Sequence, residues 1–278
     1  MGWRLALILA VALGAQQLCA GQEAAPPAPA PAANPEVVAP ASPAPGTVAP
    51  IAPAKGFYRD WWKQLGPNVV RDQKPIWLFP VSVAKGKHLK PTLAVVGVTA
   101  ALIGLDKYTT GYFYRTNSFD DFNRVFSGPN TALGAELVPA ALYVIGLARR
   151  DRYAQQTFFL AGRAVIDSEI LTTVMKDIDR RSVPSDGDFS NTWFNKQGGN
   201  YFRGVGSFPS GHTIAAFAVA TVYANRYPNP RWRRWMIYGL AGLVGFSRVS
   251  IHAHHVSDVF AGATLGYVIA RYQVLGHP

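Results

Sequence analysis

Six apolar segments after residue 90 constrain the fold more than any other feature of the chain. Five are largely uncharged runs: Pro91–Leu105, Leu137–Ala148, Thr213–Asn225, Met236–Ser247 and Val259–Ala270. The sixth is Tyr153–Lys176, which has apolar residues at helical spacing between a few charged ones. All six are rich in Ala, Leu and Gly and lack the alternation of a strand. The sequence therefore predicts an all-α domain, a bundle of about six core helices.

The N-terminus has the pattern of a secretory signal peptide. Arg4 precedes the short apolar stretch Leu5–Ala15, and small residues around Ala20 offer a cleavage site. We therefore expect residues 1–20 to be a signal peptide, with an uncleaved anchor helix as the alternative.

Residues 21–56 are expected to be a linker. Ten of the 21 prolines lie between Gln22 and Ala54, mixed with alanine. Such a stretch cannot build a core and is extended and semi-rigid. It is either a tether that holds the domain away from a membrane or wall, or a neutral spacer. Residues 57–278 then form the helical domain.

Charge and cysteine content narrow the partners and the chemistry. The formal net charge is +11, which favours anionic partners such as phosphorylated substrates or acidic lipid. A nucleic-acid partner is not expected, because no recognisable reader motif accompanies the charge. The single cysteine, Cys19, excludes an intramolecular disulfide framework and a cysteine-based metal site.

The sequence gives conflicting signals about a membrane. The uncharged runs are shorter than the roughly 20 residues that a span needs, and charged residues would lie in the middle of Tyr153–Lys176. Basic residues nevertheless gather where one end of the bundle is expected, as the positive-inside rule would have it. We expect an exported protein, periplasmic or secreted, that is soluble or peripheral on an anionic membrane surface. An integral membrane bundle is the alternative.

Three polar clusters lie at the ends of apolar segments in the second half. The first is Lys176 with Arg180 and Arg181, the second is Ser207–Thr213, and the third begins at Ser247 and ends at Asp258. In an antiparallel bundle the end of one helix and the start of the next share a face. The clusters are therefore expected to meet at one end of the bundle and form an active site there.

The residues of these clusters suit a phosphoryl group. Such a group needs cations and amide donors around its oxygens, with a nucleophile and an acid roughly in line. Two histidines, His212 and His254, can divide the roles of nucleophile and acid. Asp258, four residues after His254, can accept an imidazole N–H. The candidate phosphate-binding residues are Lys176, Arg181, Ser210, Gly211 and Arg248.

The second and third clusters resemble the type 2 phosphatidic acid phosphatase and vanadium haloperoxidase superfamily. The matching residues are Pro-Ser-Gly-His at 209–212 and Ser-Arg, five residues, His, three residues, Asp at 247–258. The resemblance implies that His254 attacks phosphorus to form a phosphohistidine, that Asp258 orients it and that His212 protonates the leaving alkoxide. It also implies a metal-independent phosphatase without a cofactor, of the acid phosphatase or phosphatidate phosphatase type, acting on a phosphorylated lipid or a small phosphate ester.

The first cluster departs from the family pattern of Lys, six residues, Arg-Pro. Val183 stands where the arginine before Pro184 is usual, and Arg181 is expected to take over the missing phosphate contact. Two alternatives stay open: a vanadium-dependent haloperoxidase, and a catalytically weak protein that binds phosphate or an anionic surface. A metal cluster of His252, His254 and His255 is not expected, because no carboxylate or cysteine pattern supports it.

Two further segments are expected beside the site. Asp177–Ser207, rich in Gly, Asn and aromatic residues, is predicted to be a lid or a substrate-selecting loop, or else a surface excursion. Thr109–Pro129 is predicted to form another wall at the same end.

Overall fold

The computed structural model describes residues 57–126, 139–186, 192–194 and 206–277. Within these ranges the chain is mostly helical and contains no strand, which confirms the all-α prediction. The predicted signal peptide and linker lie outside the described residues.

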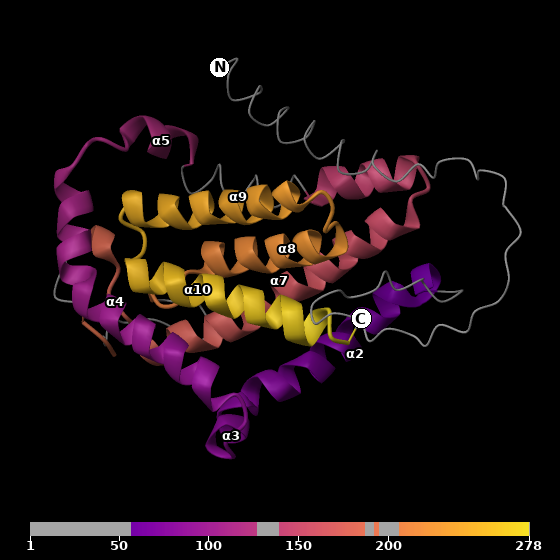
Figure 1. The fold of residues 1–278 in the computed structure, drawn as a ribbon, viewed down its shortest axis with the longest axis horizontal. Helices are drawn as coiled ribbons and strands as arrows, with labels where there is room; N and C mark the ends of the chain where they lie inside the picture. Colours follow the sequence, from indigo (N-terminus) through magenta and orange to yellow (C-terminus); the bar gives the residue numbers. More distant parts are fainter. Residues whose placement is uncertain (1–56, 127–138, 187–191, 195–205, 278) are drawn as a thin grey trace, which may run out of the picture.

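The described helices follow the chain in a simple order (Figure 1). The first half contains α2 (Phe57–Trp77), α3 (Phe79–Ala84), α4 (Leu89–Arg115), α5 (Asp120–Val125) and a helix over Pro139–Ala148. The second half contains α7 (Arg152–Asp179), the 3₁₀ turn η1 (Pro184–Asp186), α8 (Gly211–Arg226), α9 (Arg231–Ser250), α10 (Val256–Val268) and the π-helical turn η2 (Ile269–Val274).

The described residues of all six apolar segments lie in helices, but several helices are longer than the runs that predicted them. α4 has 27 residues, α7 has 28 and α9 has 20. Polar residues at the ends of the runs stay helical, so run length underestimates helix length. α2 is not among the six predicted segments, and it contains Pro67 and Pro75, residues that usually interrupt a helix.

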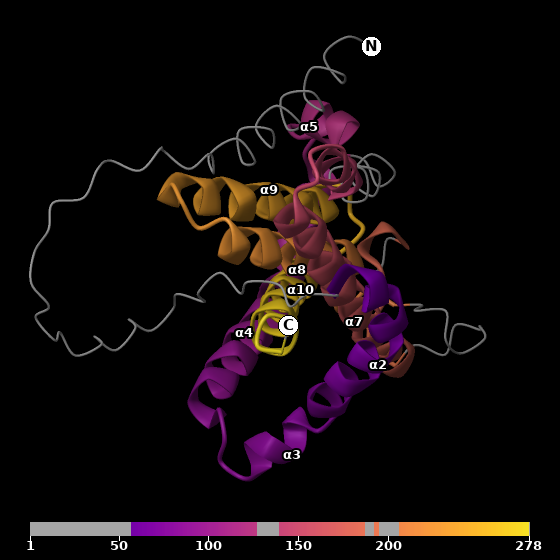
Figure 2. The same ribbon diagram turned by 90° about the vertical axis from the view of Figure 1, so that its right-hand side faces the viewer.

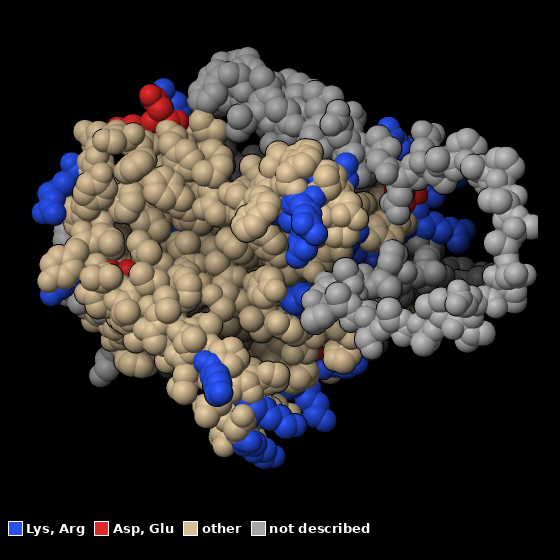
Figure 3. Space-filling view, viewed as in Figure 1, with Lys and Arg blue, Asp and Glu red and all other residues tan. Residues whose placement is uncertain are grey.

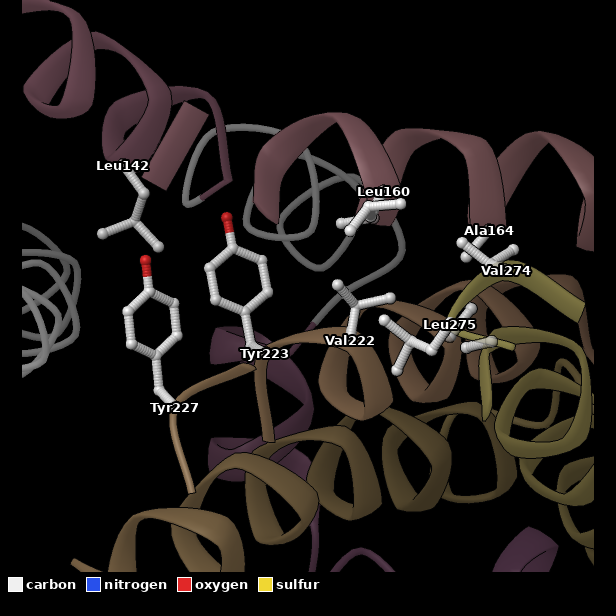
Figure 4. Close-up of a cluster of buried hydrophobic side chains, with 11 residues drawn as sticks. Leu142, Leu160, Ala164, Val222, Tyr223, Tyr227, Val274 and Leu275 are labelled. Atoms are coloured by element: carbon white, nitrogen blue, oxygen red, sulfur yellow. The ribbon is translucent and has the colours of Figure 1, made fainter. Parts of the chain in front are cut away.

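α8 is the centre of the bundle. It packs against α7, α9 and α10, and α4 lies across the outer side of α10 (Figures 1 and 2). The main hydrophobic core is formed by side chains from α7, α8, η2 and the helix over Pro139–Ala148 (Figure 4). Its buried members are Leu142, Leu160, Ala161, Ala164, Ala218, Val222, Tyr223, Tyr227, Ala270, Val274 and Leu275.

Two glycines bring α10 almost into backbone contact with α8. A Cβ on Gly266 would lie 2.2 Å from the carbonyl oxygen of Ile214, and one on Gly262 would lie 2.8 Å from that of Ser210. Four residues apart, they form a small-residue face of the kind that lets helices approach closely. The start of α10 is thereby held against the start of α8, where two of the three predicted clusters lie.

α4 presents its apolar side chains outward. It is long and apolar enough to cross a membrane, and only 6% of its most apolar 18-residue stretch is buried. Its exposed large side chains include Leu93, Val96, Val98 and Leu105. Figure 3 shows a broad uncharged area on the face that α4, α9 and α10 form, with Lys and Arg side chains around its edges. These findings do not confirm the expectation of a soluble or peripheral protein.

A buried charged cluster fastens α2 to α7, away from the predicted site. Arg163 of α7 donates to Asp72 of α2 at 2.5 Å, and both side chains are about 2% exposed or less. Arg163 also donates to the carbonyl of His277 at 3.0 Å. Gln73 of α2 donates to Asp167 of α7 at 3.0 Å. Arg163 and Asp167 in the middle of α7 therefore face protein partners rather than the surface.

Candidate active site

The three predicted clusters meet at one end of the bundle. The amide of Ser210 donates to the carbonyl of Asp258 at 3.1 Å, which joins the start of α8 to the start of α10. The amide of Ser207 donates to the carbonyl of Arg181 at 2.9 Å, and the amide of His254 donates to that of Arg248 at 3.0 Å, so the ends of α7 and α9 share this region. The geometry brings all eight predicted residues to this end, although Arg181 is oriented differently from the prediction.

His254 lies in the short connection between α9 and α10. The connection is tight, because the amides of Ala253 and His254 both donate to the carbonyl of Arg248, at 2.9 and 3.0 Å. The imidazole is 8% exposed, and its Nδ1 lies 2.7 Å from the carbonyl oxygen of Ser207. A carbonyl can only accept, so Nδ1 carries the hydrogen and Nε2 keeps its lone pair.

Burial favours the neutral form of the His254 ring. Desolvation lowers the pKa of His254 below its ordinary value, although the neighbouring Asp258 carboxylate acts in the opposite direction. A neutral imidazole with a free Nε2 is the form that can attack phosphorus.

Asp258 is fully buried and holds the loops around His254. Its Oδ2 accepts from the amide of His255 at 2.8 Å, which caps the start of α10, and from the hydroxyl of Ser207. The same oxygen lies 3.6 Å from Nδ1 of His254. In this arrangement the Ser207 carbonyl takes the imidazole hydrogen bond, and Asp258 acts on the ring through its charge and through Ser207.

The other predicted phosphate ligands surround the start of α8. Ser210 is the residue before the helix and accepts from Thr213 at 2.9 Å, and Gly211 is the first helical residue. Helix N-termini offer unpaired amides and a positive dipole end. Arg248 is held by the hydroxyl of Ser247 at 2.9 Å and by the carbonyl of Phe126 at 2.8 Å. Within the described ranges neither Lys176 nor Arg248 has a carboxylate within 4 Å, so both cations are available to an anion.

Arg181 is placed differently from the prediction, which made it a phosphate ligand. Its guanidinium is 0% exposed and is paired with Asp106 of α4 at 2.6 Å and with Asp258. The ring of Trp193 covers it at 4.7 Å. A guanidinium that already pairs with two carboxylates is a poor phosphate ligand. Its positive charge is neutralised, and its Nη1 and Nη2 atoms already donate to the two acids. The geometry therefore favours a role for Arg181 that does not involve phosphate binding.

The segments expected beside the site are only partly described. Most of the predicted lid, including residues 187–191 and 195–205, lies outside the described residues. The predicted wall is confirmed up to residue 126, because Asn123 hydrogen-bonds Ser250 and the Phe126 carbonyl holds Arg248. Aromatic rings continue the wall between α4, α5 and α9: Phe113, Phe119, Phe122, Phe126 and Phe246.

Sequence reasoning missed several residues of this site. Asp106 carried a usable signal, since it is an acidic residue directly after a long apolar run, where a charge needs a buried partner. Ser207 lay in a predicted cluster and His255 beside the predicted nucleophile, but neither was assigned a role. Ser257 carried no signal, because it belongs to the site through contacts that only the folded chain brings about. Among the described residues, no group of His, Cys, Asp and Glu side chains has an arrangement that could hold a metal ion.

Comparison with known proteins gives a consistent result. Residues 158–277 match the model of the PAP2 superfamily. The lipid A 1-phosphatase of Porphyromonas gingivalis is 40% identical over 69 residues, which cover 23% of this chain and 15% of that protein. The lipid A 4'-phosphatase of the same organism is 27% identical over 85 residues, 31% of this chain and 34% of that protein. The matches thus span about a third of these relatives or less.

A solved structure is also similar. It is the first transmembrane PAP2 type phosphatidylglycerolphosphate phosphatase from Bacillus subtilis, 23% identical, with a TM-score of 0.43 over 66% of this chain and 94% of that one. The family match covers α8, α9 and α10 together with most of α7, and it includes every predicted site residue. The resemblance to the PAP2 superfamily therefore extends over residues 158–277 of this chain.

Proposed function

We propose that the protein is a phosphatase that hydrolyses phosphate monoesters or pyrophosphates of lipids through a phosphohistidine, without a metal ion. The observation that carries the proposal is the state of His254: Nδ1 is bonded to a carbonyl, and no side chain in the described part of the chain hydrogen-bonds Nε2. Lys176, Arg248 and His254 are all close enough to His212 for their charges to act on it. The named relatives are lipid phosphatases, which supports a lipid phosphate as the substrate class.

In the proposed reaction, Nε2 of His254 bonds to phosphorus while the ester P–O bond breaks. Burial and the neighbouring cations keep His212 neutral before substrate binds. A bound phosphate anion favours its protonated form, which then gives its proton to the leaving alkoxide. Water then attacks phosphorus, the P–N bond breaks, and His212 takes a proton from the water. Lys176, Arg248 and the amides at the start of α8 stabilise the charge on the phosphoryl oxygens in both steps.

The test is phosphate release from a panel of substrates in the presence of a chelator. We expect purified protein in detergent to hydrolyse lipid phosphates, such as phosphatidate or phosphorylated lipid A, faster than small soluble esters. Vanadate should inhibit, because it resembles the five-coordinate transition state. Halide oxidation with vanadate and peroxide would instead indicate a haloperoxidase, and lipid binding without turnover would indicate a binding protein.

We further propose that the protein is embedded in a membrane. α4 is about 40 Å long at 1.5 Å per residue, which exceeds the roughly 30 Å hydrocarbon core of a bilayer. Its apolar side chains face outward, and the uncharged face of α9 and α10 continues that surface. A lipid substrate would then reach the site from the same bilayer. The expected location of the site on the extracytoplasmic side depends on the signal peptide and stays a prediction.

Extraction of isolated membranes tests the embedding. We expect the protein to stay in the pellet after washes with high salt and at alkaline pH, because buried apolar surface is insensitive to both. Detergent should release it. Release by salt alone would indicate a peripheral protein held by its basic residues.

A further inference from the structure

Arg181 joins two carboxylates that are far apart in the sequence. Its Nη2 donates to Asp106 of α4 at 2.6 Å, and its Nη1 donates to Asp258 of α10 and, at 2.6 Å, to the hydroxyl of Ser257. Ser257 completes the arrangement, since its hydroxyl and its amide both donate to Asp106, the amide at 3.2 Å. Asp106 and Asp258 are 0% exposed and Arg181 is 1% exposed.

Hydrogen bonds through Asp258 and Ser207 connect this network to the imidazole of His254. Asp258, fixed on one side by Arg181, accepts on its other oxygen from the hydroxyl of Ser207. The amide of Ser207 donates to the carbonyl of Arg181 at 2.9 Å, and the carbonyl of Ser207 holds Nδ1 of His254 at 2.7 Å. A shift of Arg181 would therefore move both the carboxylate beside the ring and the carbonyl that orients it.

The charge balance explains why two carboxylates are useful. With one carboxylate alone, Arg181 would neutralise Asp258 in a pair. With Asp106 sharing the guanidinium, the three groups keep a net charge of −1 beside His254. The ring gains positive charge when Nε2 bonds to phosphorus, and a fixed negative charge nearby stabilises that state. A buried arginine between two acids is costly as a mere structural tie.

We propose that Asp106 and Arg181 are positioning residues of the phosphatase site, acting on His254 through Asp258 and Ser207. Asp106 belongs to α4, outside the part of the chain that matches the family model. The proposal rests on the proposed function, because positioning has meaning only if His254 is the nucleophile.

Asp106→Asn tests the proposal with little change in shape. It removes one charge from the network and cannot accept as Asp106 does, so Arg181 should turn towards Asp258. We expect kcat to fall up to about 100-fold, as small displacements of reacting groups do, with KM and vanadate inhibition changed less than about twofold. Asp151→Asn is the matched control, since Asp151 caps the start of α7, at the opposite end of that helix from Lys176, and asparagine caps a helix as well as aspartate does. It should leave both constants unchanged.

A double-mutant cycle with Asp258→Asn separates positioning from stability. If Asp106 acts through Asp258, its replacement should have little further effect in the Asp258→Asn background. Independent, multiplicative effects would overturn the proposal, and so would a rise in KM or in the vanadate inhibition constant without a fall in kcat. The thermal midpoint of each variant shows whether it is folded.

Two milder variants decide the matter if Asp106→Asn does not fold. Ser257→Ala removes one hydroxyl link, and Arg181→Lys keeps the charge but cannot bridge two carboxylates in a fork. Both should lower kcat and spare KM, and unchanged kcat in both would refute the proposal. An inactive wild-type protein would instead count against the proposed function, which keeps the two failures distinct.

Discussion

Replacing His254 with alanine should abolish phosphate release. The imidazole supplies the atom that bonds to phosphorus, and no other described side chain has both its buried position and its fixed Nδ1 contact with Ser207. Loss of a nucleophile of this kind costs about 10⁴-fold or more in kcat. The measurement is phosphate release from an aryl phosphate and from a lipid phosphate, in chelator, at matched protein concentration.

His277→Ala is the control for this experiment. His277 is exposed, lies at the far end of the chain, and contributes only its backbone carbonyl to the structure described here. Rapid quench in alkaline denaturant after mixing with radiolabelled substrate should trap labelled protein in the wild type and in this control, but not in His254→Ala, because a phosphohistidine survives in alkali and is hydrolysed in acid. Turnover in the His254 variant within tenfold of wild type would show that another group attacks phosphorus.

Replacing Arg163 with methionine should destabilise the fold more than any surface substitution. Arg163 pairs with Asp72 at 2.5 Å, and both are almost fully buried. Removing the guanidinium leaves a buried carboxylate without its partner, a change that costs about 3–5 kcal/mol. The measurement is the thermal unfolding midpoint of detergent-purified protein.

Arg71→Met is the matched control, because Arg71 contacts the same two residues from the surface. It lies 3.6 Å from Asp72, donates to the carbonyl of His277 at 2.7 Å, and has a 50% exposed side chain. Its loss should cost less than about 1 kcal/mol. The double variant Asp72→Leu with Arg163→Met should recover most of the lost stability, since no charge is then left unpaired. Equal midpoints for the Arg163 and Arg71 variants would contradict the prediction.

Much of the fold could be read from the sequence because its signals are local. Apolar spacing in Tyr153–Lys176 is enough to indicate α7, since a helix buries one face wherever it packs. α2 was not predicted because prolines usually interrupt helices. The lengths of α4 and α9 were underestimated because their ends are polar. Whether the apolar faces of the helices point to the protein core or to the surface could not be predicted, because the two arrangements have the same composition. That difference decides between a soluble bundle and one surrounded by lipid.

The sequence alone determined the helical class and the polar clusters at the helix ends, because periodicity and motif spacing are properties of neighbouring residues. Only the tertiary structure decided what Arg181 does. Its partner Asp106 lies 75 residues earlier in the chain, and nothing local shows that the two meet. The role of a buried charged side chain depends on the groups that pack against it, and packing brings those groups together from distant parts of the chain.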